Sequence, residues 1–207
     1  MSSILPQIAV HRILKQGMQD LKSDPSILDE VFAYYKCNEL FKEYGEAQID
    51  KIKQWISEVK IPVVQAWSMN PQLAPQISIK LGNEQEDESK SAIGDHWGMG
   101  EESDIGMASM LVYIDIRLHA NRNSDEVLWM YHIVKYILFK RKRLAEKLGL
   151  QLHTFSATDY SREDVRLPEN IFSRYIRLRT VVQDKWTADP YLDIEDIETV
   201  VIPEPAP

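Results

Sequence analysis

Cysteine is almost absent from this chain of 207 residues, and so are long hydrophobic runs. A single residue, Cys37, excludes an internal disulfide and a cysteine-rich zinc site, and its place within a helical pattern predicts a small buried thiol. No stretch approaches the roughly 18 apolar residues of a membrane span, and the amino terminus lacks the basic start and apolar core of a secretory signal. We therefore expect no membrane contact and a reducing, aqueous compartment.

Positive charge is outnumbered by negative charge. The sequence has 24 lysines and arginines against 32 acidic residues, which gives a formal net charge of -8. This balance argues against a protein that coats nucleic acid with its whole surface, although it leaves room for a local basic patch. Hydrophobic residues make up 44% of the chain, which is enough to bury the core of one domain.

Amphipathic helical patterns fill the first 60 residues. Apolar residues at helical spacing predict a helix over 6–22. A second helix should begin at Pro25, with Asp24 as its N-cap, and end at Gly45. A third helix is predicted directly afterwards, over 46–59.

Strand patterns dominate the rest of the chain. They predict strands at 61–67, 76–81, 110–120, 150–157 and 172–182. Apolar and polar residues alternate in the third of these, so one face of the sheet should be core and the other at least partly wet. A long amphipathic helix is expected over 127–149, with capping chemistry at Asn123 and a stop at Gly149.

This order of elements predicts an α+β fold. It should combine amino-terminal helices with a mixed, mainly antiparallel sheet of about four to five strands and one long packed helix. We expect three parts along the chain, which are a helical part over 1–60, an α+β core over 61–183, and an extended acidic arm over 184–207.

Two acidic segments are candidates for contacts between molecules. Residues 82–106 contain eight acidic residues and five of the eight glycines, which predicts a long irregular loop. The arm over 184–207 carries seven acidic residues against one lysine and ends in a proline-rich stretch that cannot build a core. A short run before that end is rich in β-branched residues and is predicted to add as a strand to the sheet edge of a neighbouring molecule; it contains Ile197, Thr199, Val200, Val201 and Ile202.

The candidates for catalysis are weak. The glycine-rich stretch 94–100 lacks the spacing of a phosphate-binding loop, and no two histidines have the spacing of a zinc protease. Asp95 and His96 form the one pairing that an enzyme could use. We therefore expect no enzyme activity, no metal and no cofactor, and we keep open a cytosolic ligand-binding or hydrolytic domain with its site near Asp95 and His96.

A basic run lies in the second half of the predicted long helix. Cations near a helix carboxyl end complement the helix dipole and solubilise an exposed face, which is the simplest interpretation. The alternative is a charged surface that faces DNA or an acidic neighbour after assembly. On that hypothesis the assembly contacts are the basic run Lys140, Arg141, Lys142 and Arg143 and the acidic residues Glu84, Glu86, Asp87, Glu88 and Asp95.

Three stretches of this sequence together resemble the tail-terminator proteins of long-tailed bacteriophages, which are also called tail-completion or neck proteins. The first runs from 75 to 95 and joins an alternating strand to acidic residues; the second is the strand from 112 that leads into the helix ending at 149; the third is Phe-Ser-Arg-Tyr-Ile-Arg-Leu from 172. The resemblance covers roughly residues 46 to 182 and depends on the order of elements. The helices over the first 60 residues and the acidic arm depart from the smaller family members.

The resemblance implies a structural virion protein without catalysis. Such a protein closes into a six-membered ring at the head-proximal end of the tail, where it stops the growth of the tail tube or sheath and offers a docking face to the head. Its partners would be copies of itself and the tail-tube, tail-sheath or head–tail connector proteins, with passive contact to DNA in the channel. It would be assembled in the host cytoplasm.

Overall fold

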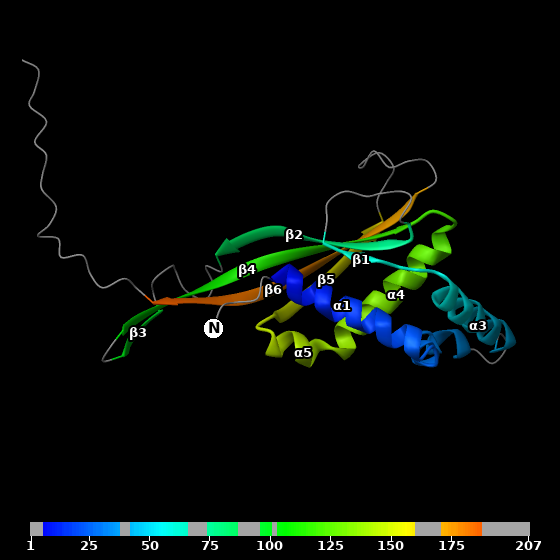
Figure 1. Cartoon of the computed structure of the whole chain (residues 1–207), viewed down its shortest axis with the longest axis horizontal. Helices are drawn as coiled ribbons and strands as arrows, with labels where there is room; N and C mark the ends of the chain where they lie inside the picture. Colours follow the sequence, from blue (N-terminus) through cyan, green and yellow to red (C-terminus); the bar gives the residue numbers. More distant parts are fainter. Residues whose placement is uncertain are drawn as a thin grey trace, which may run out of the picture.

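The computed structural model describes residues 6–37, 42–65, 74–86, 96–100, 103–159 and 171–187. They form an α+β fold, as the sequence predicts, with helices along one side of a single sheet (Figure 1). The helices are α1 (Pro6–Ser23), α2 (Ile27–Val31), the 3₁₀ helix η1 (Ala33–Lys36), α3 (Lys42–Glu58), α4 (Ser124–Lys140) and α5 (Lys142–Lys147). The strands are β1 (Val63–Val64), β2 (Gln76–Glu86), β3 (His96–Gly100), β4 (Ser103–Ala120), β5 (Gln151–Asp159) and β6 (Phe172–Thr187).

The sheet is mixed and mainly antiparallel. Its strands follow the order β1-β2-β4-β6-β5, and β3 pairs with β4 beyond the end of β2. Only β1 and β2, among the strands described, run parallel. The sheet has six strands rather than the predicted four to five, because β3 falls in a segment that we expected to be a loop.

The core lies between the helices and one face of the sheet. Strand β4 gives this core every second residue from Val112 to Ala120, and Ile176 and Leu178 of β6 join them. From the helical side, α1 contributes Ile13 and Leu14, which are 2% and 0% exposed. Burial of an aliphatic side chain of this size stabilises a fold by about 1.5–3 kcal/mol, so this layer holds the helices on the sheet.

Two polar contacts fix the start of α4. Asn123 accepts a hydrogen bond from the backbone N–H of Glu126 at 3.0 Å, which confirms the predicted capping role. The Glu126 side chain is buried and accepts a hydrogen bond from Trp55 Nε1 at 2.9 Å, while the Trp55 ring meets Trp129 edge to face. These contacts tie α3 to the first turn of α4.

The amino-terminal helices differ from the prediction at Gly45. Instead of one helix that ends there, α2 and η1 are short and α3 begins at Lys42, so Gly45 lies inside a helix. A Cβ atom at Gly45 would lie 2.2 Å from the backbone oxygen of Tyr35. The glycine is therefore needed for close packing between α3 and η1. The prediction that a helix ends at Gly45 was wrong, because glycine is also the residue typical of helix ends.

The predicted long helix is divided in two at Arg141. Its backbone leaves the helical region (φ -100°, ψ 18°), and α5 then packs against β5 and α1. The basic sequence contains no proline or glycine at this point, so local propensity gave no sign of the turn. The predicted end of the helical region is confirmed, since Gly149 has a φ of +85°.

The predicted loop over 82–106 is largely strand in its described parts. Residues 82–86 extend β2, 96–100 form β3, and 103–106 begin β4. Glycine and acidic residues have low strand propensity, but pairing with long neighbouring strands overrides a weak local preference. For the same reason residues 184–187, which we assigned to the acidic arm, continue β6 opposite β4.

Two smaller predictions are also corrected. Cys37 is exposed rather than buried, because it caps η1, none of whose residues is buried, and its Sγ lies 3.5 Å from the Ala33 carbonyl oxygen. The strand predicted over 61–67 is reduced to Val63–Val64 within the described residues, which pair with Ile77 and Ser78.

Candidate functional site

The first candidate surface is a ribbon of strands that projects from the helical layer. Strand β2 stops pairing with β4 at Glu86 and Met110, but β4 continues back to Ser103. This extension pairs with β3 on one side and with the end of β6 on the other. At about 3.3 Å per residue, the 18 residues of β4 span about 60 Å, and Figure 1 shows that the β3 end extends past the helices. We call residues 96–100, 103–109 and 183–187 the projecting arm.

The second candidate surface is the face of the sheet opposite the described helices. Strand residues alternate between the two faces, and those between the core positions of β2, β4 and β6 are mostly polar or charged. We call this surface the open sheet face, because no described helix covers it, and define it by Ser78, Lys80, Tyr113, Asp115, Arg117, Tyr175, Arg177 and Arg179. Arg177 and Arg179 are its exposed members, whereas Ser78 and Asp115 are buried.

A buried carboxylate organises the centre of the open sheet face. The Asp115 side chain is 7% exposed and accepts hydrogen bonds from Arg177 through Nε at 2.9 Å and Nη2 at 3.3 Å. The Tyr175 hydroxyl also donates to Asp115. The Arg177 guanidinium lies 5.2 Å from the centre of the Tyr175 ring and 5.8 Å from that of Tyr113. The bidentate contact with Asp115 and the contacts with the two tyrosine rings fix the orientation of the Arg177 guanidinium. The Arg177 side chain is 47% exposed.

Cations are close together around this centre. Partial burial and the positive charge of Arg117 lower the pKa of Lys80, although Asp115 opposes that change. Burial, and then the same Arg117 charge, lower the pKa of His119 to about 4. These shifts reflect the cost of placing like charges near one another away from water.

Buried polar groups lie at one end of the same face. His119 Nδ1 is hydrogen-bonded to Ser173 Oγ at 2.6 Å, and His119 is 3% exposed. Gln76 faces His119 in the strand register and is 1% exposed, and neither oxygen nor nitrogen of its amide has a partner within the described structure. A histidine bonded to a serine hydroxyl, with an unpartnered amide opposite it, could bind a small polar group.

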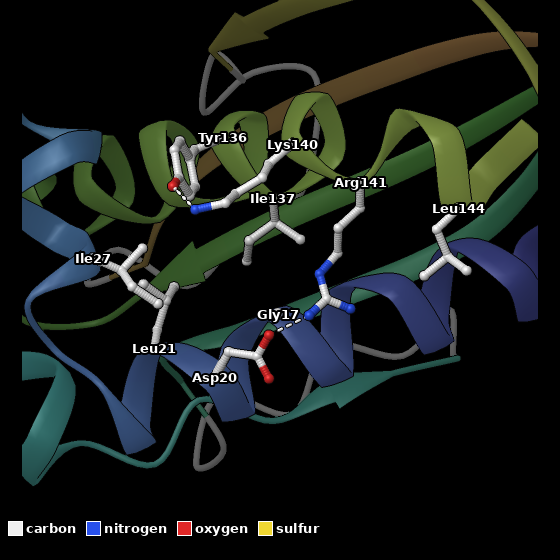
Figure 2. A pocket seen from close by; sticks show the side chains of 9 residues that line it. All are labelled: Gly17, Asp20, Leu21, Ile27, Tyr136, Ile137, Lys140, Arg141 and Leu144. Atoms are coloured by element: carbon white, nitrogen blue, oxygen red, sulfur yellow. Dashed lines mark hydrogen bonds and ion pairs between the residues drawn. The ribbon is translucent and has the colours of Figure 1, made fainter.

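A third surface is a pocket of about 290 Å³ between α1 and the α4–α5 turn (Figure 2). Gly17, Leu21, Ile137 and Leu144 give it an apolar floor. The two cations at its rim, Lys140 and Arg141, are paired within the molecule. Arg141 reaches across to Asp20 of α1, while Lys140 contacts the Tyr136 hydroxyl and lies 3.3 Å from Glu30 of α2.

The predicted basic surface is therefore divided by the fold. Lys140 and Arg141 join α4 to α1 and α2, and hydrogen bonds from Tyr136 and Lys140 lower the pKa of Glu30. Lys142 and Arg143 are exposed on α5, where Lys142 lies 3.9 Å from Glu146. The four residues do not form one free positive surface.

The acidic candidates are only partly placed. Glu84 is exposed on β2 opposite Val112, and Glu86 lies opposite Met110 at the end of that strand. His96 begins β3 opposite Met107, so it belongs to the projecting arm. The other predicted contacts lie outside the described residues; they are Asp87, Glu88, Asp95, Ile197, Thr199, Val200, Val201 and Ile202.

Sequence reasoning missed the open sheet face as a site. The signal was present, because charged residues occupy alternate positions in two predicted strands, at Asp115 and Arg117 and again at Arg177 and Arg179. A period of two places such residues on one face of a sheet. What the sequence lacked was the register that brings Asp115 opposite Arg177.

Comparison of the sequence with protein-family models and with curated proteins gives no match. Within the described ranges, no helix is long and apolar enough to cross a membrane. The same ranges contain no group of three or more histidine, cysteine or acidic residues that could bind a metal ion. The fold alone therefore classifies this protein, as an α+β domain with a projecting ribbon of strands.

Proposed function

We propose that this protein is a structural neck protein of a long-tailed bacteriophage, which closes into a ring that terminates the tail and helps to join it to the head. The observation that carries the proposal is the projecting arm. A ribbon of few strands without a covering layer contributes little stability alone, so long strands that leave their helices are typical of a contact between molecules.

The edges of the sheet support an assembly of copies. Strand β5 is an edge strand, and β2 is paired with β1 only at Ile77 and Ser78 on its outer side within the part of the chain described. Exposed edges carry unpaired backbone groups that can bind a strand from another molecule. A ring provides each copy with one neighbour on either side, so an arm from one copy can meet an edge of the next.

The family resemblance supplies the particular assembly. It favours a six-membered ring in the virion, with the tail-tube, tail-sheath or connector proteins above and below it, and no catalytic step. The mixed sheet, the long helix region after β4 and the final long strand agree with the order of elements on which the resemblance depends.

Native mass spectrometry of the full-length protein tests this proposal. We expect a closed oligomer, with six copies as the main species, and negative-stain images of the same sample should show rings with a central channel. A protein that stays monomeric at the highest soluble concentration, or that forms only dimers, would contradict the ring.

A further inference from the structure

The open sheet face is a basic surface on an acidic protein. It brings together Lys80, Arg117, Arg177 and Arg179, whereas the chain as a whole has a net charge of -8. We infer that this face binds the acidic carboxyl-terminal segment, residues 188–207, of a second copy of the chain. This inference rests on the proposed self-assembly and names a contact that would hold neighbouring copies together.

Charge complementarity is the first argument. Residues 188–207 contain six acidic residues and no lysine or arginine. On the open sheet face, Asp115 is the carboxylate among the residues that define it, and Arg177 already neutralises that group. Lys80 and Arg117 lie on this face opposite Asp115 and Ser78 in the strand register, so an acidic peptide laid along it would meet cations from three strands.

The spacing of charges is the second argument. Arg177 and Arg179 are two residues apart on one strand, which places them about 6.6–6.8 Å apart on one face. Asp193 and Glu195 have the same separation in sequence, as do Asp196 and Glu198. An extended acidic segment can therefore face successive cations along β6. Arg117, on the neighbouring strand β4, adds a further cation beside them.

The exit point of the chain favours a second copy. Strand β6 runs from Phe172 to Thr187, so the chain leaves at the tip of the projecting arm and away from Arg177 (Figure 1). The remaining 20 residues can span up to about 70 Å when extended. In a ring, this reach brings the segment to the neighbouring molecule without reversing the direction of the chain.

An acidic peptide fits this face better than nucleic acid does. The surrounding molecule is negatively charged, which repels a DNA duplex at long range, whereas in a ring the segment of the neighbouring copy is held at a high local concentration. The rings of Tyr113 and Tyr175 are already in contact with Arg177, so they orient this cation before a ligand arrives.

The test uses full-length protein and a labelled synthetic peptide of residues 188–207. The receptor carries a neutral segment (Asp193→Asn, Glu195→Gln, Asp196→Asn and Glu198→Gln), so its own segment does not compete. We expect saturable binding in fluorescence anisotropy, and binding that weakens steeply as salt is added. A peptide with the same four replacements should bind at least about tenfold more weakly.

Receptor variants locate the binding surface. Arg179→Glu reverses an exposed charge on the open sheet face and should weaken peptide binding by about tenfold or more. Lys15→Glu makes the same change on an exposed position of α1 and should leave the affinity within about twofold. Circular dichroism of each variant establishes that it is folded.

The outcomes separate this inference from the proposed ring. Absence of peptide binding in a protein that still forms rings would overturn the inference alone, whereas peptide binding by a protein that forms no ring would contradict the ring alone. Equal effects of Arg179→Glu and Lys15→Glu would overturn the assignment of the face. If the peptide fails to bind while a DNA duplex binds and loses affinity on Arg179→Glu, the inference is overturned and nucleic acid is the ligand of this face.

Discussion

Gly45 shows that a glycine can be required for close packing rather than for ending a helix. It lies inside α3 against the backbone of Tyr35, and an added Cβ would come within 2.2 Å of the Tyr35 oxygen. Alanine would favour the helix by up to about 1 kcal/mol, but overpacking against a backbone atom costs about 1–3 kcal/mol.

We therefore expect Gly45→Ala to destabilise the protein by about 1–2 kcal/mol despite its better helix propensity. Glu46→Ala, at the next and exposed position, serves as the matched control and should change the stability by less than about 0.5 kcal/mol. Chemical denaturation measures both. A more stable Gly45→Ala protein would contradict the close contact between α3 and η1.

His119 predicts how the stability changes with pH. Its pKa is lowered to about 4 in the folded protein, so the unfolded chain takes up a proton at higher pH than the folded one. Stability should therefore be complete above about pH 6.5 and should fall as the pH drops towards 4, with a loss of about 2 kcal/mol from this group at pH 5.

Denaturation at pH 7 and at pH 5 tests this prediction. His119→Gln should be less stable at pH 7, because the bond to Ser173 is altered, but it should lose less stability between the two pH values than the original chain. The pKa of His132 is also lowered by burial, so part of the pH effect should remain in this variant. An unchanged pH dependence in His119→Gln would contradict a buried, neutral His119.

At the scale of elements, the α4–α5 turn depends on contacts that connect distant parts of the chain. Arg141 is 19% exposed and is paired with Asp20, whereas Arg143 is exposed two residues later. We expect Arg141→Gln to lower the free energy of unfolding by about 0.5–1 kcal/mol, since a partly exposed ion pair contributes about that much.

Arg143→Gln is the matched control and should leave the stability unchanged within about 0.5 kcal/mol. Thermal unfolding at low and high salt measures both variants. The difference between them should shrink at high salt, because screening weakens an exposed pair. Equal melting temperatures at low salt would show that the Arg141–Asp20 pair does not hold α5 against α1.

The elements show where sequence reasoning succeeds. The helix over Pro6–Ser23 and the central part of β4 follow from periodicity alone, because each buries one face against a large core. The start of α4 follows from capping chemistry at Asn123. These features depend on residues that are near one another in the chain.

The remaining features depend on contacts between distant residues. Strand β3 has three glycine or histidine positions and a weak strand pattern, yet it forms because β4 offers a partner. The open sheet face requires the register between β4 and β6, and the pairing of Lys140 and Arg141 requires the position of α1 and α2. Local sequence patterns predict neither the register between strands nor the packing of helices. The sequence could therefore identify candidate residues but not which of them come together.

At the scale of the whole molecule, the proposed ring depends on the projecting arm. Met107 lies in the middle strand of the arm, where it pairs with His96 of β3 and with Lys185 of β6. Proline in a central strand removes a ladder hydrogen bond, so Met107→Pro should disrupt the arm while the core under the helices stays folded. Ser103→Pro is the matched control, because proline is tolerated at the first residue of a strand.

The most direct test is native mass spectrometry of the original chain, Met107→Pro and Ser103→Pro under the same conditions. We expect closed rings for the original chain and for Ser103→Pro, and monomers with an unchanged helical circular dichroism signal for Met107→Pro. Rings of the same size in all three proteins would contradict the central claim that the arm assembles this protein.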